Sequence, residues 1–256
     1  MKWMILTTAM MFFVLNNMSA QSVHDVVVDN TITIGTSYKK LDDRFILSSA
    51  STGSVFNIGY KYLKLGPVMK TALSLNADFG SLSNRDAMVK AQQFSVYFSQ
   101  GFSLWRSDNE KFNSYTGYSI GTTPSFLKAI SKEDTRNSWS TVNDLSLYQS
   151  FVYTTGHTRL TWDINLPLVG LSSRPGEKSN DHNTANGLVY DSYSNLFFTS
   201  WKDRRAISSS FDIKTIIDDN ISLMVGGRFV YDKMQKYNLY KDLQGGLYGG
   251  ISFSIK

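Results

Sequence analysis

The chain has 256 residues and a formal net charge of +5, and 42% of its residues are hydrophobic, 14% aromatic and 18% charged. Because it contains no Cys, the composition excludes a disulfide scaffold, a Cys-ligated zinc or iron–sulfur site and a thiol enzyme. The low charged fraction and the many aromatic residues exclude wholesale disorder. The mean hydropathy of −0.21 is too low for a bundle of membrane helices.

The N-terminal segment has the pattern of a secretory signal peptide. Lys2 supplies a positive charge, Met4 to Leu15 is an almost unbroken apolar run, and Ala20 is a small residue suited to cleavage. The apolar run is too short to span a bilayer. We therefore expect a signal peptide at residues 1–20 and an exported mature chain at residues 21–256. For an exported chain, anionic lipid headgroups or solutes are more suitable partners of basic residues than nucleic acid, with which we expect no contact. Because the basic residues are scattered, we favour an ordinary solvated surface over a binding patch.

Alternation of apolar and polar residues dominates the mature chain, which is the pattern of β-strands with two unlike faces. The pattern predicts strands at 31–38, 54–65, 70–80, 92–105, 112–121, 142–154, 157–169, 187–200, 205–217, 221–232 and 243–255. Turn-forming residues such as Gly66-Pro67 and Asp219-Asn220 separate several of them. Two longer polar stretches, 122–140 and 171–186, are predicted to be loops. We find no helical pattern, linker or domain boundary.

Two architectures fit many alternating strands. The apolar face could point inward, as in a soluble exported β-sandwich or ligand-binding barrel, or outward into lipid. The strands are about nine to thirteen residues long, which matches a tilted crossing of a bilayer. Their second face is polar and Gly-rich, and aromatic residues such as Trp105 and Trp201 stand near strand ends, as in interfacial girdles. We therefore predict an all-β fold, a single transmembrane antiparallel β-barrel.

The number of strands is left open between ten and twelve. The eleven predicted strands conflict with the even number that single-chain bacterial barrels use. The segment from Arg44 to Ala50 could supply a twelfth strand, whereas fusing or dropping the weak first segment would leave ten. We expect twelve strands, both termini in the periplasm and the longer loops outside.

The end of the chain resembles the terminal strand of Gram-negative outer-membrane β-barrel proteins. Gly250, Phe253 and Ile255 match the Gly, aromatic and apolar positions of that family's assembly signal, although the chain ends in Lys256 and the family usually ends in an aromatic residue. The resemblance implies a location in the outer membrane of a Gram-negative bacterium. It also implies contact with outer-membrane lipid and with the barrel-assembly machinery, and another envelope protein is a further candidate partner.

Charged residues on the polar face of the strands are the candidates for a lumen. In a narrow barrel such charges can pair with each other and plug the lumen, or they can line a polar path for small solutes. We favour the plug. The candidate lumen-lining residues are Lys61, Asp78, Asp144, Arg159, Asp163, Asp212, Lys214 and Arg228.

One polar string raises an enzymatic alternative. The residues from His182 to Gly187 are similar to the His-x-Ser-Asn-Gly stretch of outer-membrane phospholipases, which would make His182 the base and Thr184 the nucleophile. Thr stands where that family has Ser, and one extra residue would turn the downstream side chains to the other face of a strand. The simpler interpretation is a polar loop rich in turn formers.

The sequence therefore predicts a non-enzymatic barrel, either a structural or interaction component of the outer membrane or a narrow solute pore. Two-His metal spacing is absent from the sequence, and we expect no metal site and no cofactor. Arg174, which precedes Pro175-Gly176, could bind a headgroup phosphate or a carboxylate. We favour the simpler interpretation, a solvated loop residue beside a turn.

Overall fold

The computed structural model describes residues 26–47, 49–107, 111–131, 135–174, 196–218, 220–235 and 239–255. The predicted signal peptide and the pair His182 and Thr184 lie outside these ranges. The strands are β1 (Val27–Asp43), β2 (Ser51–Leu65), β3 (Met69–Ser83), β4 (Ala87–Arg106), β5 (Phe112–Ser131), β6 (Thr135–Thr155), β7 (Thr158–Ser173), β8 (Leu196–Ser200), β9 (Arg204–Asp218), β10 (Ile221–Met234) and β11 (Tyr240–Ile255).

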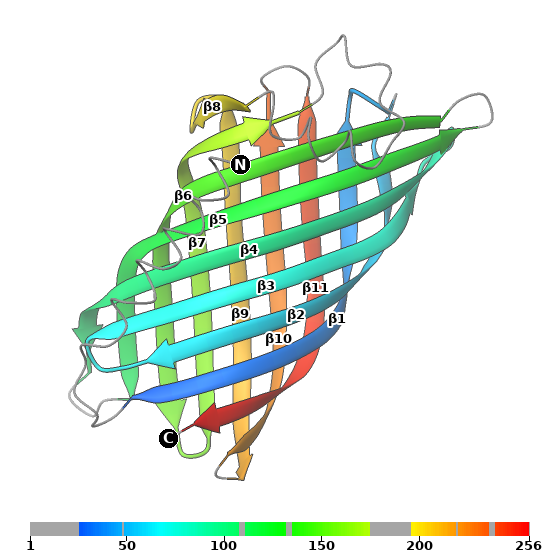
Figure 1. Cartoon of the computed structure of the whole chain (residues 1–256). Helices are drawn as coiled ribbons and strands as arrows, with labels where there is room; N and C mark the ends of the chain where they lie inside the picture. Colours follow the sequence, from blue (N-terminus) through cyan, green and yellow to red (C-terminus); the bar gives the residue numbers. More distant parts are fainter. Residues whose placement is uncertain are drawn as a thin grey trace, which may run out of the picture.

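These strands form one closed antiparallel sheet (Figure 1). Its order is β6-β5-β4-β3-β2-β1-β11-β10-β9-β7-β8, and the pairing of β6 with β7 closes it. The short strand β8 pairs only with Val169–Ser173 of β7, while β9 pairs with Thr158–Asn165 of the same strand. Thus β8 and β9 follow each other along one side of β7, and the other ten strands make the barrel.

The two ends of the barrel differ. At the turn end, at the bottom of Figure 1, β1 begins and β11 ends, with Val28 and Ile255 paired. Short hairpins such as Gly156-His157 connect neighbouring strands there. At the loop end, at the top of Figure 1, lie β8 and the connection between β1 and β2. The first residues of β1 and the last residues of β11 therefore lie at the same end of the barrel, as the sequence predicts.

The outer wall is an apolar belt. Leu247 is 71% exposed, Val225 61% and Ile34 58%, and these side chains stand on the face that the alternation assigns to lipid. A closed barrel satisfies the backbone hydrogen bonds of every strand in lipid. The predicted transmembrane barrel is therefore confirmed, and the soluble alternatives with an inward apolar face are wrong. In the described ranges, no helix is long and apolar enough to cross a membrane.

Three details of the strand prediction are wrong. The barrel has ten strands rather than twelve, because the segment from Arg44 to Ala50 contains a turn in which the N–H groups of Ile46 and Leu47 donate to the carbonyl of Asp43 (3.2 and 2.9 Å). The predicted strand at 187–200 is represented among the described residues by β8 alone. The predicted loop at 122–140 consists mostly of strand, since β5 continues to Ser131 and β6 starts at Thr135.

The part of the β5–β6 hairpin at the loop end was not predicted, and the reason is physical. At the loop end, Leu127 and Ala129 are buried inside the barrel while Lys128 between them is exposed outside. Beyond the lipid belt the outer wall faces water, so the polarity of the alternation reverses. A prediction that requires apolar residues on the same face along the whole strand therefore ends each strand where the two faces exchange polarity.

A charge placed in the belt should destabilise the barrel. Leu247 lies in the middle of β11 with its side chain outward. We expect Leu247→Arg to lower the free energy of unfolding in lipid by about 2–4 kcal/mol, the cost of Arg near the midplane of a bilayer. Urea titration of the barrel refolded into vesicles measures this change, with Leu247→Val as the control that keeps an apolar side chain. Equal stability of the Arg variant and the Val control would place this wall in water.

Candidate functional site

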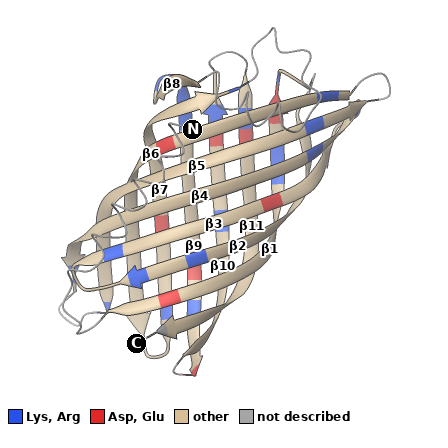
Figure 2. Ribbon diagram, viewed as in Figure 1, with Lys and Arg blue, Asp and Glu red and all other residues tan. Residues whose placement is uncertain are grey.

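The inside of the barrel is the candidate site, because charged residues on eight of its ten strands, β1, β2, β3, β6, β7, β9, β10 and β11, form ion pairs there. Figure 2 shows where the charged residues lie along the strands. Closest to the turn end, Asp29 of β1 forms ion pairs with Arg159 of β7 and with Lys214 of β9, whose Nζ lies 2.5 Å from Asp29 Oδ1. The hydroxyl of Ser254 donates to the same oxygen at 2.6 Å. Asp29 thus connects β1 with side chains of β7, β9 and β11.

The next layer is a lower charge cluster made of Lys61, Lys70, Asp163 and Asp212. Lys61 Nζ lies 3.0 Å from Asp163 Oδ2 and 2.9 Å from Asp212 Oδ2, and Lys70 Nζ lies 2.5 Å from Asp163 Oδ1. Lys61 is on β2 and Asp163 on β7, and these strands are five places apart in either direction around the barrel. The ion pair between them therefore crosses the lumen from wall to opposite wall.

Two tyrosines complete the lower charge cluster. The hydroxyl of Tyr148 donates to Asp163 (2.8 Å), and that of Tyr248 donates to Asp212 (2.5 Å). The ammonium group of Lys70 also donates to Ser150 Oγ (2.7 Å). Each carboxylate accepts from a cation and from a hydroxyl, which is what a charge needs when it leaves water.

A second group of ion pairs lies nearer the loop end. Arg204 Nη2 lies 2.7 Å from Asp232 Oδ2, and its Nε donates to both oxygens of Asp232 at 2.8 and 3.0 Å. Arg204 also pairs with Asp144. This forked geometry suits the planar guanidinium, which binds one carboxylate at two atoms and reaches a second. Lys39 pairs with Asp242 at 2.8 Å across the β1–β11 seam.

An apolar plug fills the lumen at the loop end. Its centre includes Ile46 and Leu47, 5% and 6% exposed, which the turn after β1 folds into the barrel. Asp43 holds this turn, since its carboxylate accepts from the N–H of Phe45 (3.1 Å) and pairs with Arg174 Nη2 (2.6 Å). The buried residues of the plug are Leu41, Ile46, Leu47, Val55, Leu82, Val89, Ala91, Leu127, Ala129, Val142, Met234 and Tyr240.

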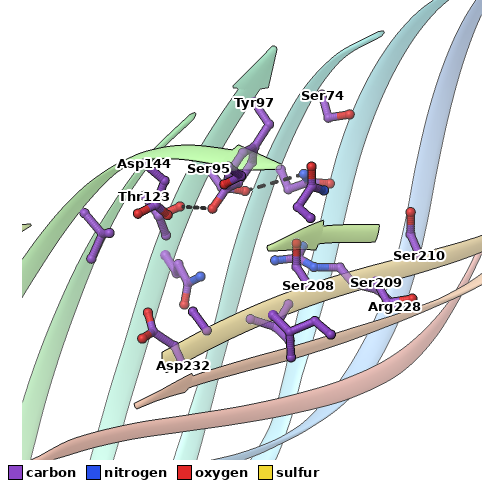
Figure 3. Close-up of a pocket in the computed structure, with 18 of the residues that line it drawn as sticks. Ser74, Ser95, Tyr97, Thr123, Asp144, Ser208, Ser209, Ser210, Arg228 and Asp232 are labelled. Atoms are coloured by element: carbon purple, nitrogen blue, oxygen red, sulfur yellow. Dashed lines mark hydrogen bonds between the residues drawn. The ribbon is translucent and has the colours of Figure 1, made fainter. Parts of the chain in front are cut away.

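A polar cavity lies between the lower charge cluster and the apolar plug (Figure 3). Asp163 and Asp212 line it at one end, and Met234 and Tyr240 line it at the other. Hydroxyl groups dominate its wall, and some bond to each other, as Tyr97 does to Thr123 (2.9 Å). Its serine side chains include Ser74, Ser95, Ser99, Ser125, Ser140, Ser146, Ser208 and Ser210.

Arg228 is the loosely held cation of this cavity. Its Nη2 lies 3.7 Å from Asp78 Oδ2, beyond hydrogen-bond distance. Asp78 accepts instead from the side-chain amides of Asn57 (2.5 Å) and Gln244 (3.3 Å). The guanidinium of Arg228 therefore keeps donors available toward the cavity that it lines.

The structure places all eight charged candidates on inward positions, and each takes part in an ion pair. Sequence reasoning missed eight further members of the lumen ion pairs. Asp29, Lys70 and Arg204 pair with candidates directly. The others pair among themselves or with Arg204, and they are Lys39, Asp43, Arg174, Asp232 and Asp242. Most of these stand near strand ends, where the predicted strands are shorter than the observed ones. The interpretation of Arg174 as a solvated loop residue is wrong, because it lies against the Tyr240 ring, 4.7 Å from the ring centroid, and pairs with Asp43.

The residues of the assembly signal lie on the closing strand β11. Gly250 pairs with Thr33 of β1, and a Cβ added to it would lie 2.2 Å from the carbonyl oxygen of Ile32. Only glycine allows this close approach. Phe253 faces outward at the turn end, and Ile255 pairs with Val28. Among the described residues, no group of His, Asp or Glu could hold a metal ion.

No protein-family model and no curated protein sequence matches the chain. Among solved structures, the outer-membrane protease OmpT from Escherichia coli aligns with a TM-score of 0.55 and 8% identity over 93% of this chain and 99% of that chain. The translocator domain of the autotransporter NalP from Neisseria meningitidis aligns with a TM-score of 0.43 and 10% identity over 97% and 94% of the two chains. Ail of Yersinia pestis aligns with a TM-score of 0.37 and 11% identity over 89% and 98%.

The similarity to OmpT concerns the fold alone. It agrees with the closed antiparallel sheet and with the apolar outer wall described above. The chain is a transmembrane β-barrel of the Gram-negative outer-membrane type.

Proposed function

We propose that this barrel is a non-enzymatic structural or interaction component of the outer membrane whose lumen is closed to solutes. The supporting observation is the charge balance of the lumen, where ten ion pairs among the described residues join eight basic side chains to eight aspartates. The basic members are Lys39, Lys61, Lys70, Arg159, Arg174, Arg204, Lys214 and Arg228. The acidic members are Asp29, Asp43, Asp78, Asp144, Asp163, Asp212, Asp232 and Asp242.

A lumen of this kind is poorly suited to conduction. A permeating ion needs binding groups that are accessible and weakly held. Here the side chain of Lys70 is 0% exposed, and Lys61 crosses the lumen to contact two aspartates. An ion passing the lower charge cluster would have to separate these pairs and leave buried charges without partners, at several kcal/mol each. The apolar plug adds a second barrier in series.

A narrow solute pore is the second candidate. The polar cavity and the loosely held Arg228, which is 19% exposed, favour it. In this alternative the lower charge cluster and the plug would open together, and the hydroxyl-lined cavity would carry a small polar solute between them.

Conductance measurements separate the two candidates. We expect the folded mature barrel to give no discrete conductance steps in planar lipid bilayers at moderate voltage, because both ends of the lumen are closed. A heat-dependent shift in gel mobility of the same preparation shows that the protein is folded. Reproducible steps from protein that shows this shift, altered by Arg159→Gln or Arg228→Gln, would establish the pore and reject the closed barrel.

Export, assembly and partners belong to the same proposal. We infer removal of residues 1–20 by signal peptidase and insertion by the barrel-assembly machinery through Gly250, Phe253 and Ile255. Another envelope protein is the partner class that an interaction role requires. No cofactor is needed. The phospholipase hypothesis stays a prediction, because His182 and Thr184 lie outside the described ranges. Lipase activity that is lost in His182→Ala would support it, and activity retained in that variant would reject it.

A further inference from the structure

The outer wall carries an unusual basic row at the loop end. Lys233 of β10 pairs across the sheet with Arg205 of β9 on one side and with Lys241 of β11 on the other. Neighbouring strands are about 4.8 Å apart, so three cations stand side by side across about 10 Å. Their chain neighbours Arg204, Asp232 and Asp242 are buried inside, which directs the three cations outward. Figure 2 shows Lys and Arg close to the upper ends of β9 and β10.

The basic row lacks a counter-charge in the described part of the chain. No ion pair there joins Arg205, Lys233 or Lys241 to an acidic side chain, in contrast to the paired lumen. The acidic neighbour of the row is Asp42, the pairing partner of Lys241 on β1, and it binds Arg44 Nε at 2.9 Å. Like charges directly opposite each other on a sheet destabilise it. An arrangement of this kind is best relieved by an anionic ligand.

The wall beneath the basic row is apolar. Two residues toward the turn end, Ile207, Tyr231 and Leu243 pair across the same three strands. Below them, Gly245 of β11 and Gly227 of β10 are outward positions that carry no side chain. A Cβ added to Gly245 would meet no atom within 4 Å, and one added to Gly227 would meet its nearest atom at 3.6 Å. A ligand on this wall therefore meets cations at one end and an open apolar surface along its length.

We propose that the basic row and the apolar wall beneath it, with Gly245 and Gly227, form a binding site for an acyl lipid whose headgroup carries more than one phosphate. Arg205, Lys233 and Lys241 would bind the phosphates, with the guanidinium able to bind two oxygens at once. Two phosphates match three cations in charge, whereas one phosphate leaves a cation unpaired. The acyl chain would lie along Gly245 and Gly227. This site is independent of whether the lumen conducts.

Native mass spectrometry of the mature barrel in neutral detergent tests the site. The probe is lipid A, which carries two phosphates, compared with its monophosphorylated form and with inorganic phosphate. We expect one lipid A molecule per barrel, weaker binding of the monophosphorylated form and no competition from inorganic phosphate. Arg205→Gln with Lys233→Gln and Lys241→Gln should weaken binding of lipid A roughly 100-fold, since each basic residue near an anionic surface contributes about a factor of five.

A matched variant removes the same charge elsewhere. Arg85, Lys90 and Lys128 are also exposed near the loop end, and Lys90 and Lys128 pair across β4 and β5. Replacing these three by Gln should change the affinity for lipid A less than threefold. Equal loss in both triple variants would show attraction by net charge alone and overturn the site. Competition by inorganic phosphate would reduce it to an anion site, and equal binding of the monophosphorylated lipid would reject the second phosphate.

The acyl part of the site has its own test. Gly245→Val adds a branched side chain at a position where a Cβ meets no atom within 4 Å, so the variant should fold and show the normal heat-dependent mobility shift. We expect its affinity for lipid A to fall several-fold while all three cations remain. Unchanged affinity would overturn the placement of the acyl chain along the β10–β11 seam.

Discussion

Removal of both barriers in the lumen is expected to turn a silent barrel into a conducting one. The first variant replaces Lys61, Lys70, Asp163 and Asp212 by Ser, which deletes two positive and two negative charges and leaves the lumen neutral. The second replaces Ile46 and Leu47 by Gly, which empties the centre of the apolar plug. Two barriers in series conduct only when both are gone. Discrete conductance steps are therefore expected from the combined variant and not from either variant alone.

Planar bilayer recording of the three variants measures this, beside wild-type protein and a check of heat-dependent mobility for each. Conductance in the charge variant alone would show that the apolar plug is permeable. A folded combined variant without conductance would mean that Arg204, Asp144 and Asp232 still close the lumen, and would reject the assignment of the barriers to the two layers removed.

A large loss of stability is expected from breaking one buried ion network on one side only. Arg204→Met leaves Asp144 and Asp232 buried without the cation that joins them. Breaking a buried pair in this way costs about 3–5 kcal/mol, because an uncompensated charge stays behind. The triple variant Asp144→Asn with Arg204→Met and Asp232→Asn removes all three charges and should recover most of that loss.

Unfolding in guanidinium chloride, followed by loss of the heat-dependent mobility shift, measures these free energies. Lys202→Met is the control, since Lys202 is exposed in the turn just before β9. Its free energy of unfolding should stay within about 0.5 kcal/mol of the wild type. If the triple variant is no more stable than Arg204→Met, the loss comes from packing around the side chain and not from the stranded carboxylates.

The strand faces could be predicted because they depend on local chemistry. A residue such as Leu247 or Ile34 contacts lipid and must be apolar, whereas its neighbours in the chain face the lumen and can be polar. The sequence therefore alternates with a period of two residues. The same alternation assigned Lys61, Asp163 and Arg228 to the lumen face. It failed at 122–140 because the outer wall leaves the lipid there and the polarity of the two faces exchanges.

The number of strands could not be predicted with the same rule. Residues 187–200 look like a full strand, yet the described part of this segment pairs only with the upper end of β7, beside β9. Ile46 and Leu47 look like strand residues for the same reason, since an apolar side chain suits the lipid and the inside of the plug equally well. Only the path of the chain distinguishes these two environments.

The sequence by itself determined the fold class, the lipid-facing surface and the charged character of the lumen face, because each depends on the polarity of single residues and their immediate neighbours. Only the tertiary structure decided which charges meet. Lys61 and Asp163 are 102 residues apart and come from opposite walls, and Arg205, Lys233 and Lys241 form a row through the register of three strands. Strand pairing and barrel closure depend on contacts between distant segments, and the polarity of one segment does not specify which segment it pairs with.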